Sequence, residues 1–315
     1  MDEYAALEAW RSVVGTAELR PMSKVSNPLW RVTAEDGREW VLKHLPEFPP
    51  GVGPVEEYRV LCYLRTAGIP VAVPVVTDDG LIAYNADNLR TELSQKLPTG
   101  KEAYTLIPLL PNDSGLYEAP ELAHAIGAGI GRLDRVLADC PWHVTSFTDD
   151  PARQILDERY PGLPDEVRAF TDPLRDRLYE AIADLPTQRT HGDCNVGNVL
   201  IHDGEVSGFI DLDHLPTGPR IRDLSYYLVS RLNAHMDQDP EAMVPVLHNY
   251  VAGYNVEYPL GDRELAAVVP LMLTVEIGIA DWHTEGWGAN PVSYRSNLRT
   301  IEWMARHYEE ITAAS

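Results

Sequence analysis

Three side chains in the second half of the chain have the types and the spacing that phosphoryl transfer needs. Asp193 and Asn198 stand in the stretch THGDCNVGNVL, and Asp211 follows in GFIDLDH, 18 positions after Asp193. Transfer of a phosphoryl group from a nucleotide to a hydroxyl needs a carboxylate that orients the hydroxyl and accepts its proton. It also needs oxygen ligands for the Mg²⁺ that bridges the phosphates. We therefore predict that Asp193 is the base and that Asn198 and Asp211 are the metal ligands.

A hairpin is expected to carry the two metal ligands to the same side. Residues 199–201 and 206–210 are short apolar strands, and His-Asp-Gly at 202–204 is typical of the turn between them. Asp, Asn and Gly also gather in ordinary turns, so the HGD triplet alone would be weak evidence. The strands on both sides favour the catalytic interpretation.

The composition is that of an ordinary globular protein with an acidic surface. The 315 residues are enough for two lobes with large cores, and 44% are hydrophobic. There are 26 basic and 48 acidic residues, which give a formal net charge of −22. This charge disfavours nucleic acid and anionic membranes as partners. It is compatible with a cationic acceptor, and equally with selection for solubility or a salty habitat.

The chain shows no sign of export or membrane insertion. The start, MDEYAALEAW, is acidic rather than basic, so no signal peptide is indicated. The apolar run at 265–280 contains Pro270 and Glu276 and is too short to span a bilayer, which favours a buried helix. The three cysteines have no metal-type spacing and fit a reducing compartment. We expect a cytoplasmic protein, and the oligomeric state is left open.

The catalytic stretch resembles the aminoglycoside phosphotransferase and choline kinase family, a branch of the protein-kinase-like fold. The family signature, H-G-D-x-x-x-x-N followed by I-D-[WFL]-[DE], is matched by HGDCNVGN and IDLD. Other stretches follow the family's order between Leu19 and Leu232. The resemblance implies an α+β, two-lobe fold with a small antiparallel sheet in the N-terminal lobe and a mostly helical C-terminal lobe. We place the nucleotide-binding lobe and hinge at 1–110, and the catalytic and acceptor-binding lobe at 111–315.

The resemblance also implies nucleotide contacts in the N-terminal lobe. An amphipathic helix at 1–14 and three antiparallel strands are predicted, with a turn at 34–37. Lys43, on the third strand, would steady the α- and β-phosphates, and Glu57, or its neighbour Glu56, would hold Lys43. Taken alone, Lys43 would equally suit a solvent-exposed strand edge. The remaining expected contacts are Ser26 and Asn27 in a first hairpin without a glycine-rich loop, and the backbone of Ile107 and Leu109 in a strand at 106–110 that leads into the hinge. The phosphoryl donor is expected to be ATP or GTP.

The C-terminal lobe is expected to support the catalytic loop and to bind the acceptor. Helices are predicted at 118–137 and 164–184. Near the end of the first lies Leu133-Asp134, where the family often has Leu-His. The resemblance gives His191 and Asp223 supporting roles, and Asp213 either binds the metal or supports it through water. Carboxylates beside tryptophan suit an amine or a sugar, although they also suit a solvated helix face. The acceptor candidates are Asp281, Trp282 and Glu285, with Trp287 and Tyr294 nearby.

The expected function is ATP- or GTP-dependent O-phosphorylation of a small molecule. The resemblance favours an aminoglycoside-like antibiotic, an amino sugar or an amino alcohol as acceptor. One alternative is a bacterial Ser/Thr protein kinase of the same superfamily, although no APE-like end of an activation segment follows Asp211. A second is an inactive nucleotide-binding module, against which the intact Asp193, Asn198 and Asp211 argue.

Overall fold

The chain forms two compact units with separate cores. The structure, a computed structural model, describes residues 3–22, 28–45, 54–83, 103–113, 120–142, 144, 150–284 and 288–314. Unit 1 comprises Met1–Pro111, Cys140–Phe147 and Gly208–Asp213. Unit 2 comprises Asn112–Asp139, Thr148–Ser207 and His214–Ser315.

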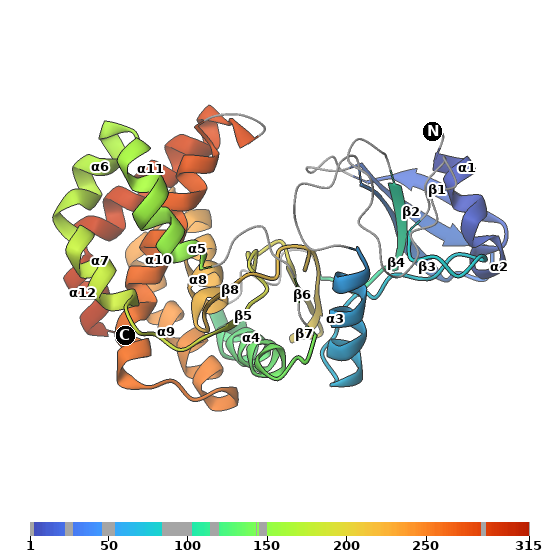
Figure 1. The fold of residues 1–315 in the computed structure, drawn as a ribbon, viewed down its shortest axis with the longest axis horizontal. Coiled ribbons are helices and arrows are strands. Elements are labelled where there is room, and N and C mark those ends of the chain that lie inside the picture. The colour runs from blue at the N-terminus through green and yellow to red at the C-terminus, as the bar shows by residue number, and fades with distance from the viewer. Residues whose placement is uncertain are drawn as a thin grey trace. The chain divides into compact units, whose positions relative to one another are not determined.

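Unit 1 is built on an antiparallel sheet. Its strands are β1 (Ala17–Pro21), β2 (Leu29–Ala34), β3 (Glu39–Leu45) and β4 (Ala103–Pro108), in that order across the sheet (Figure 1). The turn between β2 and β3 closes through Gly37, whose φ of +83° suits glycine. Its helices are α1 (Glu3–Leu7), a 3₁₀ turn at Glu8–Trp10, α2 (Arg11–Val14) and α3 (Pro54–Thr66).

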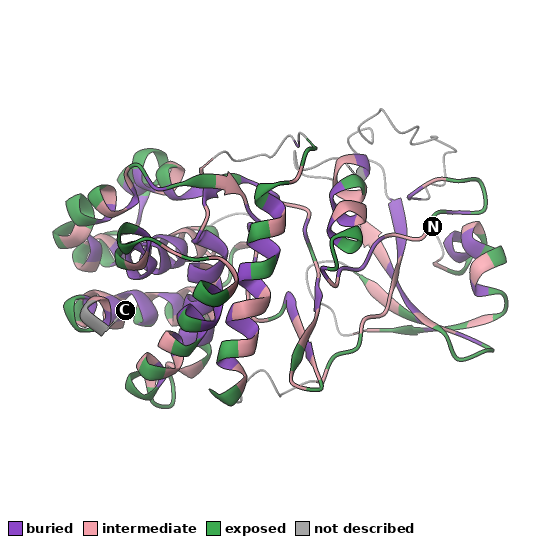
Figure 2. Ribbon diagram, turned by 90° about the horizontal axis from the view of Figure 1, so that it is seen from below, coloured by how far each residue is buried: buried purple, intermediate pink, exposed green. Residues whose placement is uncertain are grey.

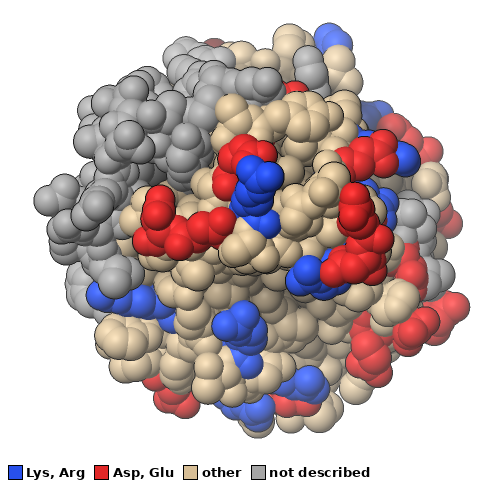
Figure 3. Space-filling model, turned by 90° about the vertical axis from the view of Figure 1, so that its right-hand side faces the viewer, with Lys and Arg blue, Asp and Glu red and all other residues tan. Residues whose placement is uncertain are grey.

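The N-terminal helices of unit 1 pack on the sheet through one apolar cluster. Trp10, Leu42 and Leu106 are buried at its centre, and the Trp10 indole donates to the carbonyl of Val75 at 2.7 Å. The solvent side of the strands has exposed ion pairs, such as Glu18 with Arg20. Acidic and basic side chains lie interspersed on one face of the molecule (Figure 3). Exposed pairs of this kind contribute little stability, so the buried cluster holds the sheet.

Unit 2 is mostly helical, and several of its helices have one buried and one exposed side (Figure 2). The helices are α4 (Ala123–Ala138), α5 (Pro151–Gln154), α6 (Asp165–Thr171), α7 (Arg175–Ile182), α8 (Arg222–His235), α9 (Pro240–Glu257), α10 (Asp262–Trp282), α11 (Pro291–Arg306) and α12 (Tyr308–Ala314). Short 3₁₀ turns lie at Pro120–Leu122, Tyr160–Gly162 and Asp172–Leu174, and a π-helical turn at Ile155–Arg159. Strand β5 (Thr187–Arg189) pairs with β8 (Thr217–Pro219), and β6 (Val199–His202) pairs with β7 (Glu205–Phe209).

Helices α4 and α9 approach each other closely because glycines lie where they cross. A Cβ atom on Gly127 would lie 2.0 Å from the carbonyl oxygen of Tyr250, and one on Gly253 would lie 2.0 Å from that of His124. The close approach lets the hydroxyl of Tyr254 on α9 donate to Asp134 of α4 at 2.9 Å. The two glycines therefore allow α9, which carries Tyr254, to approach Asp134 closely.

Helix α10 is buried, as expected, but it is longer than the apolar run in the sequence suggests. It covers 21 residues, and it is the one helix in the described part of the chain that is long and apolar enough to cross a membrane. The length argument against a span was therefore wrong. In its most apolar window 67% of the residues are buried inside the protein. Neighbouring helices thus cover the apolar surface of α10.

The predicted α+β class is confirmed, while several predicted element limits were wrong. The predicted strand at 106–110 begins earlier, as β4, and ends at Pro108. Of the predicted helix at 118–137, the described residues form a 3₁₀ turn at Pro120–Leu122 and α4 from Ala123. The predicted helix at 164–184 is interrupted at Asp172–Leu174, because Pro173 there lacks an N–H for the helical ladder.

Candidate active site

The loop between β5 and β6 brings Asp193 and Asn198 together. The Asn198 side-chain amide donates to Asp193 Oδ2 at 2.9 Å and to the Asp193 backbone carbonyl at 2.8 Å. The amide of Asn195 donates to the other carboxylate oxygen, Oδ1, at 3.0 Å. Asp193 is half-buried, so its oriented carboxylate still meets solvent. A carboxylate held in this way can accept a proton from a hydroxyl.

Asp223, in the first turn of α8, supports the loop that contains Asp193. Its carboxylate accepts from the backbone N–H of His191 at 2.5 Å and from that of Gly192 at 3.0 Å. Gly192 has a φ of +89°, and a Cβ atom there would lie 2.4 Å from Pro216 Cδ. The buried His191 accepts from the N–H of Asp193 at 3.3 Å through Nδ1. These contacts fit the supporting roles predicted for His191 and Asp223.

Two residues of this loop region were missed by the sequence reasoning. Asn195 contacts Asp193 as described, and Tyr226 lies one turn after Asp223 on α8. Burial and the Asp193 carboxylate, to which its hydroxyl donates, raise the pKa of Tyr226 well above its ordinary value. The guanidinium of Arg222 lies 5.6 Å from the Tyr226 ring centre and donates to the Gly192 carbonyl at 2.7 Å. The i, i+3 spacing places Tyr226 on the same helix face as Asp223, and this spacing could have indicated Tyr226 as a residue of the site.

In unit 1, Lys43 on β3 lies among three carboxylates. Its ammonium is 2.6 Å from Asp211 Oδ1 and 3.9 Å from Asp213 Oδ2. Burial alone would lower the pKa of Lys43, but Asp211, Asp213 and Glu57 together raise it. Lys43 is therefore a fixed positive charge in this site.

Glu57 on α3 lines the same cavity of unit 1 as Lys43, and Glu56 does not. Burial and the neighbouring Asp213 raise the pKa of Glu57 to about 7, although Lys43 opposes the shift. The cavity combines a charged wall with an apolar one, as a nucleotide requires. Its lining residues are Lys43, Leu45, Glu57, Leu61, Ala72, Pro74, Ile82, Ala83, Thr105, Ile107, Phe209, Ile210, Asp211, Leu212 and Asp213.

The two predicted metal ligands belong to different units. Asn198 is in unit 2, where its amide nitrogen is taken up by Asp193, which leaves the amide oxygen as the ligand atom. Asp211 is in unit 1 and has a φ of +57°, a conformation that costs energy for a residue other than glycine. An amide oxygen and a carboxylate are the donors that Mg²⁺ prefers, so the residue types fit. That both residues hold one ion stays a prediction.

The other predicted nucleotide contacts have different outcomes. Ile107 lines the cavity of unit 1. The N–H of Leu109 donates to the Glu39 carbonyl at 3.2 Å, so this amide is already used within unit 1. Ser26 and Asn27 lie outside the described residues.

The predicted acceptor residues lie at the end of α10. Asp281 is paired with Arg159 at 3.4 Å, and the Trp282 side chain is exposed. Tyr294 on α11 donates to Glu166 at 2.6 Å. Glu285 and Trp287 lie outside the described residues. The ion pair of Asp281 reduces the charge it would offer an ammonium group.

A separate group of potential ligands lies at the turn of the β6–β7 hairpin. Asp113, His202 and Asp203 could offer three ligand atoms. A ring nitrogen of His202 lies 2.8 Å from Asp113 Oδ1, and the Asp203 N–H donates to Asp113 Oδ2 at 2.9 Å. The hydrogen bond with Asp113 raises the pKa of His202. We interpret this group as a hydrogen-bond network that stabilises the turn of the β6–β7 hairpin.

The sheet of unit 1 and the HGD loop of unit 2 are features of a protein-kinase-like phosphotransferase. A model of the phosphotransferase enzyme family matches residues 18–260. The chain therefore belongs to this family, and it is an enzyme that transfers phosphoryl groups.

Relatives and solved structures agree with this class. The chain is 24% identical over 282 residues to the serine/threonine protein kinase RdoA of Salmonella typhimurium, which covers 86% of this chain and 78% of the relative. The amicoumacin kinase hAmiN, solved with AMP-PNP, Ca²⁺ and Ami, is 17% identical, with a TM-score of 0.70 and coverage of 98% of this chain and 92% of hAmiN. A microcompartment-associated aminopropanol kinase is 14% identical, with a TM-score of 0.74 and coverage of 99% and 98%. At these identities the solved structures show the fold alone.

Proposed function

We propose that the enzyme transfers the γ-phosphoryl group of ATP or GTP to a hydroxyl of a small amine-bearing molecule. The acceptors we favour are an aminoglycoside-like antibiotic, an amino sugar or an amino alcohol. The observation that carries the proposal is the orientation of Asp193, whose two carboxylate oxygens are held by the amides of Asn195 and Asn198. A binding module would have no use for a carboxylate positioned in this way.

The residues of the chain divide the work between the two units. Unit 1 would bind the nucleotide, with Lys43 on the nonreactive phosphates and Glu57 orienting Lys43. Unit 2 would bind the acceptor and orient its hydroxyl through Asp193, which takes the proton as the phosphoryl group is transferred. Asn198 and Asp211 would hold the Mg²⁺ that neutralises charge on the phosphates. Most of the rate enhancement would come from alignment and charge neutralisation.

An amine-bearing acceptor is compatible with the net charge of −22. Two structures with the same fold are named as kinases of amicoumacin and of aminopropanol, and aminopropanol is by its name an amino alcohol.

The three free cysteines fit the cytoplasm as the compartment in which the enzyme acts; they are Cys62, Cys140 and Cys194.

The screen that tests the proposal pairs Mg·ATP with pools of amino alcohols, amino sugars and aminoglycosides. ADP release should accompany a gain of one phosphate in the mass of the acceptor. Asp193→Asn should abolish the transfer while calorimetry shows unchanged Mg·ATP binding, because Asp193 acts on the acceptor. Asp262→Asn, an exposed aspartate on α10, is the matched control and should keep full activity. Transfer by Asp193→Asn at the wild-type rate would exclude Asp193 as the base.

A protein acceptor is the second candidate, because the relative that matches 86% of the chain is named a serine/threonine protein kinase. Labelled ATP with a mixture of dephosphorylated proteins tests this candidate beside the small-molecule pools. Label on Ser or Thr and none on any small molecule would favour the protein acceptor. Mg·ATP binding without transfer to either pool would contradict both candidates.

A further inference from the structure

We propose that Asp134 keeps its proton at neutral pH and donates it in a hydrogen bond to Asp223, and that this bond positions the catalytic loop from behind. The proposal rests on the proposed function, which makes Asp193 the base on that loop. Asp134 lies near the C-terminal end of α4 and is fully buried. It touches no substrate, so its role is that of a positioning residue.

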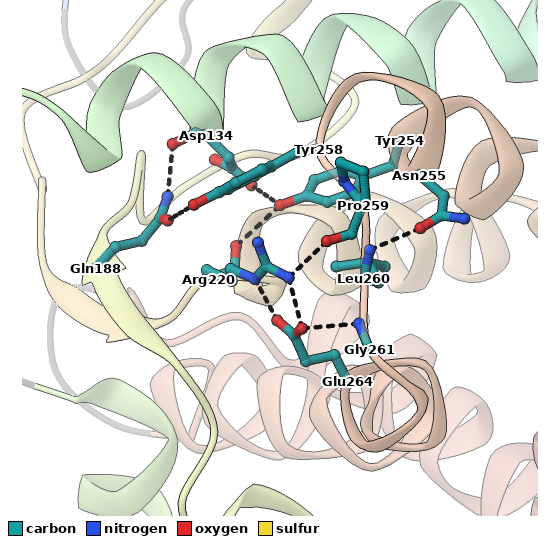
Figure 4. Close-up of polar contacts among 10 residues, drawn as sticks. All are labelled: Asp134, Gln188, Arg220, Tyr254, Asn255, Tyr258, Pro259, Leu260, Gly261 and Glu264. Carbon is teal, nitrogen blue, oxygen red and sulfur yellow. Dashed lines mark hydrogen bonds and ion pairs between the residues drawn. The ribbon is translucent and has the colours of Figure 1, made fainter.

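The two oxygens of Asp134 have different surroundings. Oδ2 accepts from the Tyr254 hydroxyl at 2.9 Å. Oδ1 is buried, and no N–H or O–H group in the described residues donates to it. The nearby amide of Gln188 donates instead to the backbone carbonyl of Asp134, at 2.7 Å (Figure 4). An ionised Asp134 would leave half of its charge buried without a donor, which is costly, whereas a protonated Asp134 becomes a donor itself.

Asp223 is the neighbouring carboxylate whose charge and side-chain hydrogen bond act on Asp134. Both oxygens of Asp223 are held by backbone N–H groups, those of His191 and Gly192. Burial and the adjoining Asp223 carboxylate raise the pKa of Asp134 well above its ordinary value. Two buried carboxylates in contact cannot both ionise, so one of them holds a proton.

The positions of the two residues in their helices determine which carboxyl group keeps the proton. Asp223 is the second residue of α8, where the positive end of the helix dipole favours a negative charge. Asp134, in the C-terminal half of α4, has no helix N-terminus to stabilise a negative charge. The two N–H donors on Asp223 act in the same direction. The proton therefore belongs on Asp134.

The remaining groups around the pair do not reverse this assignment. The titratable and charged groups that face Asp134 are Asp223, Tyr254, Arg220 and Cys194. Burial and the carboxylates raise the pKa of the Cys194 thiol, so it stays neutral.

Arg220 is the cation of this group, and its charge is already shared. Its guanidinium binds both carboxylate oxygens of Glu264 and lies 4.3 Å from the Tyr258 ring centre (Figure 4). Arg220 lowers the pKa of Asp134, but burial and the Asp223 carboxylate outweigh this effect.

The proposal explains why this chain can have Asp134 where the family often has histidine. A protonated carboxyl and an imidazole each offer a hydrogen-bond donor in a position that faces a carboxylate. An ionised carboxylate offers none. The exchange is thus conservative in hydrogen bonding only if Asp134 is protonated.

The proposal can be tested without any acceptor. We would follow the carboxyl ¹³C resonances of labelled aspartate in the full-length protein from pH 5 to 9, and assign Asp134 with Asp134→Asn. Hydrogen exchange of the peptide that contains His191 and Gly192 reports on the loop, after correction for the intrinsic rate at each pH. The variants are Asp134→Asn, which keeps a donor and cannot ionise, and Asp134→Leu, which has none. Asp139→Asn, an exposed change at the end of the same helix, is the control.

We expect one aspartate resonance that is protonated at pH 7 and disappears in Asp134→Asn. Loop exchange in Asp134→Asn should stay within twofold of the wild type and of the control. In Asp134→Leu it should rise about tenfold or more, with circular dichroism showing that the protein is still folded. An Asp134 that is ionised at pH 7, or equal loop exchange in Asp134→Leu and Asp134→Asn, would overturn the proposal. If Asp134→Leu does not fold, the resonance of the wild type decides alone. Failure of the proposed function would appear in Asp193→Asn and leaves these readouts unchanged.

Discussion

Asn198 donates to Asp193 twice, at 2.9 Å to the carboxylate and at 2.8 Å to the backbone carbonyl. Both bonds use the amide nitrogen, so the rotamer that orients Asp193 leaves the amide oxygen as the atom predicted to bind the metal. One side chain would thereby couple the geometry of the proposed base to that of the proposed metal site.

Replacement of Asn198 should therefore harm two properties together. In Asn198→Ala we expect kcat to fall by about 100-fold or more, the usual scale for loss of one preorganised catalytic group. The Mg²⁺ concentration that gives half-maximal activity should also rise. Asn195→Ala is the matched control, because Asn195 also binds Asp193 but is not a proposed ligand. It should lower kcat and leave the Mg²⁺ dependence unchanged. The same Mg²⁺ dependence in both variants would remove Asn198 from the metal site.

The pair Glu57 and Glu56 allows a test of the nucleotide site within one helical turn. Glu57 lines the cavity with Lys43, and its charge helps to raise the pKa of Lys43. Glu57→Gln should raise the KM for ATP by about tenfold, since Lys43 loses the neighbouring carboxylate of Glu57. Glu56→Gln should stay within twofold of the wild type. Larger damage from Glu56→Gln than from Glu57→Gln would contradict the assignment.

Glu276 on α10 should give the folded protein a distinct pH dependence. It is fully buried, one oxygen accepts from Asn297 at 2.7 Å, and burial raises its pKa to about 8, against an opposing effect of Asn297. The unfolded chain loses this proton near the ordinary value of 4.5, whereas the folded protein retains it. The stability that the proton contributes is therefore complete below pH 4.5 and falls as the pH rises to about 8.

Urea unfolding of the wild type and Glu276→Gln across this pH range measures the effect. The free energy of unfolding of the wild type should fall with a slope of up to about 1.4 kcal/mol per pH unit relative to the variant. Glu241→Gln, an exposed change on α9, should follow the wild type. Parallel curves for the wild type and Glu276→Gln would mean that Glu276 is ionised in the folded state.

The close crossing of α4 and α9 predicts a strict requirement for glycine. A methyl group on Gly253 would collide with the backbone of His124, which cannot move aside as a flexible side chain can. Gly253→Ala should lower the free energy of unfolding by about 1–3 kcal/mol, the usual cost of overpacking. Gly162→Ala, which points into open space, is the control. Equal thermal midpoints for the two variants would contradict the close crossing.

Local patterns in the sequence predicted the parts of the site that depend on neighbours along the chain. The strand that carries Lys43, the helix that carries Glu57 and the hairpin with Asp203 and Gly204 at its turn are found as expected. Each is set by alternation, capping or turn chemistry over a few residues.

Contacts between distant segments could not be predicted from those patterns. Asp134 meets Tyr254 across 120 positions, and nothing near Asp134 in the sequence shows that its carboxyl is buried. The hydroxyl of Tyr226 and the buried carboxyl of Glu276 are similar cases. The apolar run around Pro270 was likewise judged too short, because polar residues that belong to α10 flank it. The roles of Asp281 and Trp282 stay predictions, because surface residues leave no packing signal in a single sequence.

The segment Gly208–Asp213 belongs to unit 1, although in the sequence it is separated from the other parts of that unit, Met1–Pro111 and Cys140–Phe147, by residues of unit 2. Phe209 donates its N–H to the Pro70 carbonyl at 2.8 Å, and Asp211 binds Lys43. A fragment that stops at Pro111 would thus lack one side of the cavity and two of the three carboxylates around Lys43, those of Asp211 and Asp213. Domain grafting between relatives should therefore exchange this hexapeptide together with the N-terminal portion, because neither piece alone forms the complete lining of the cavity.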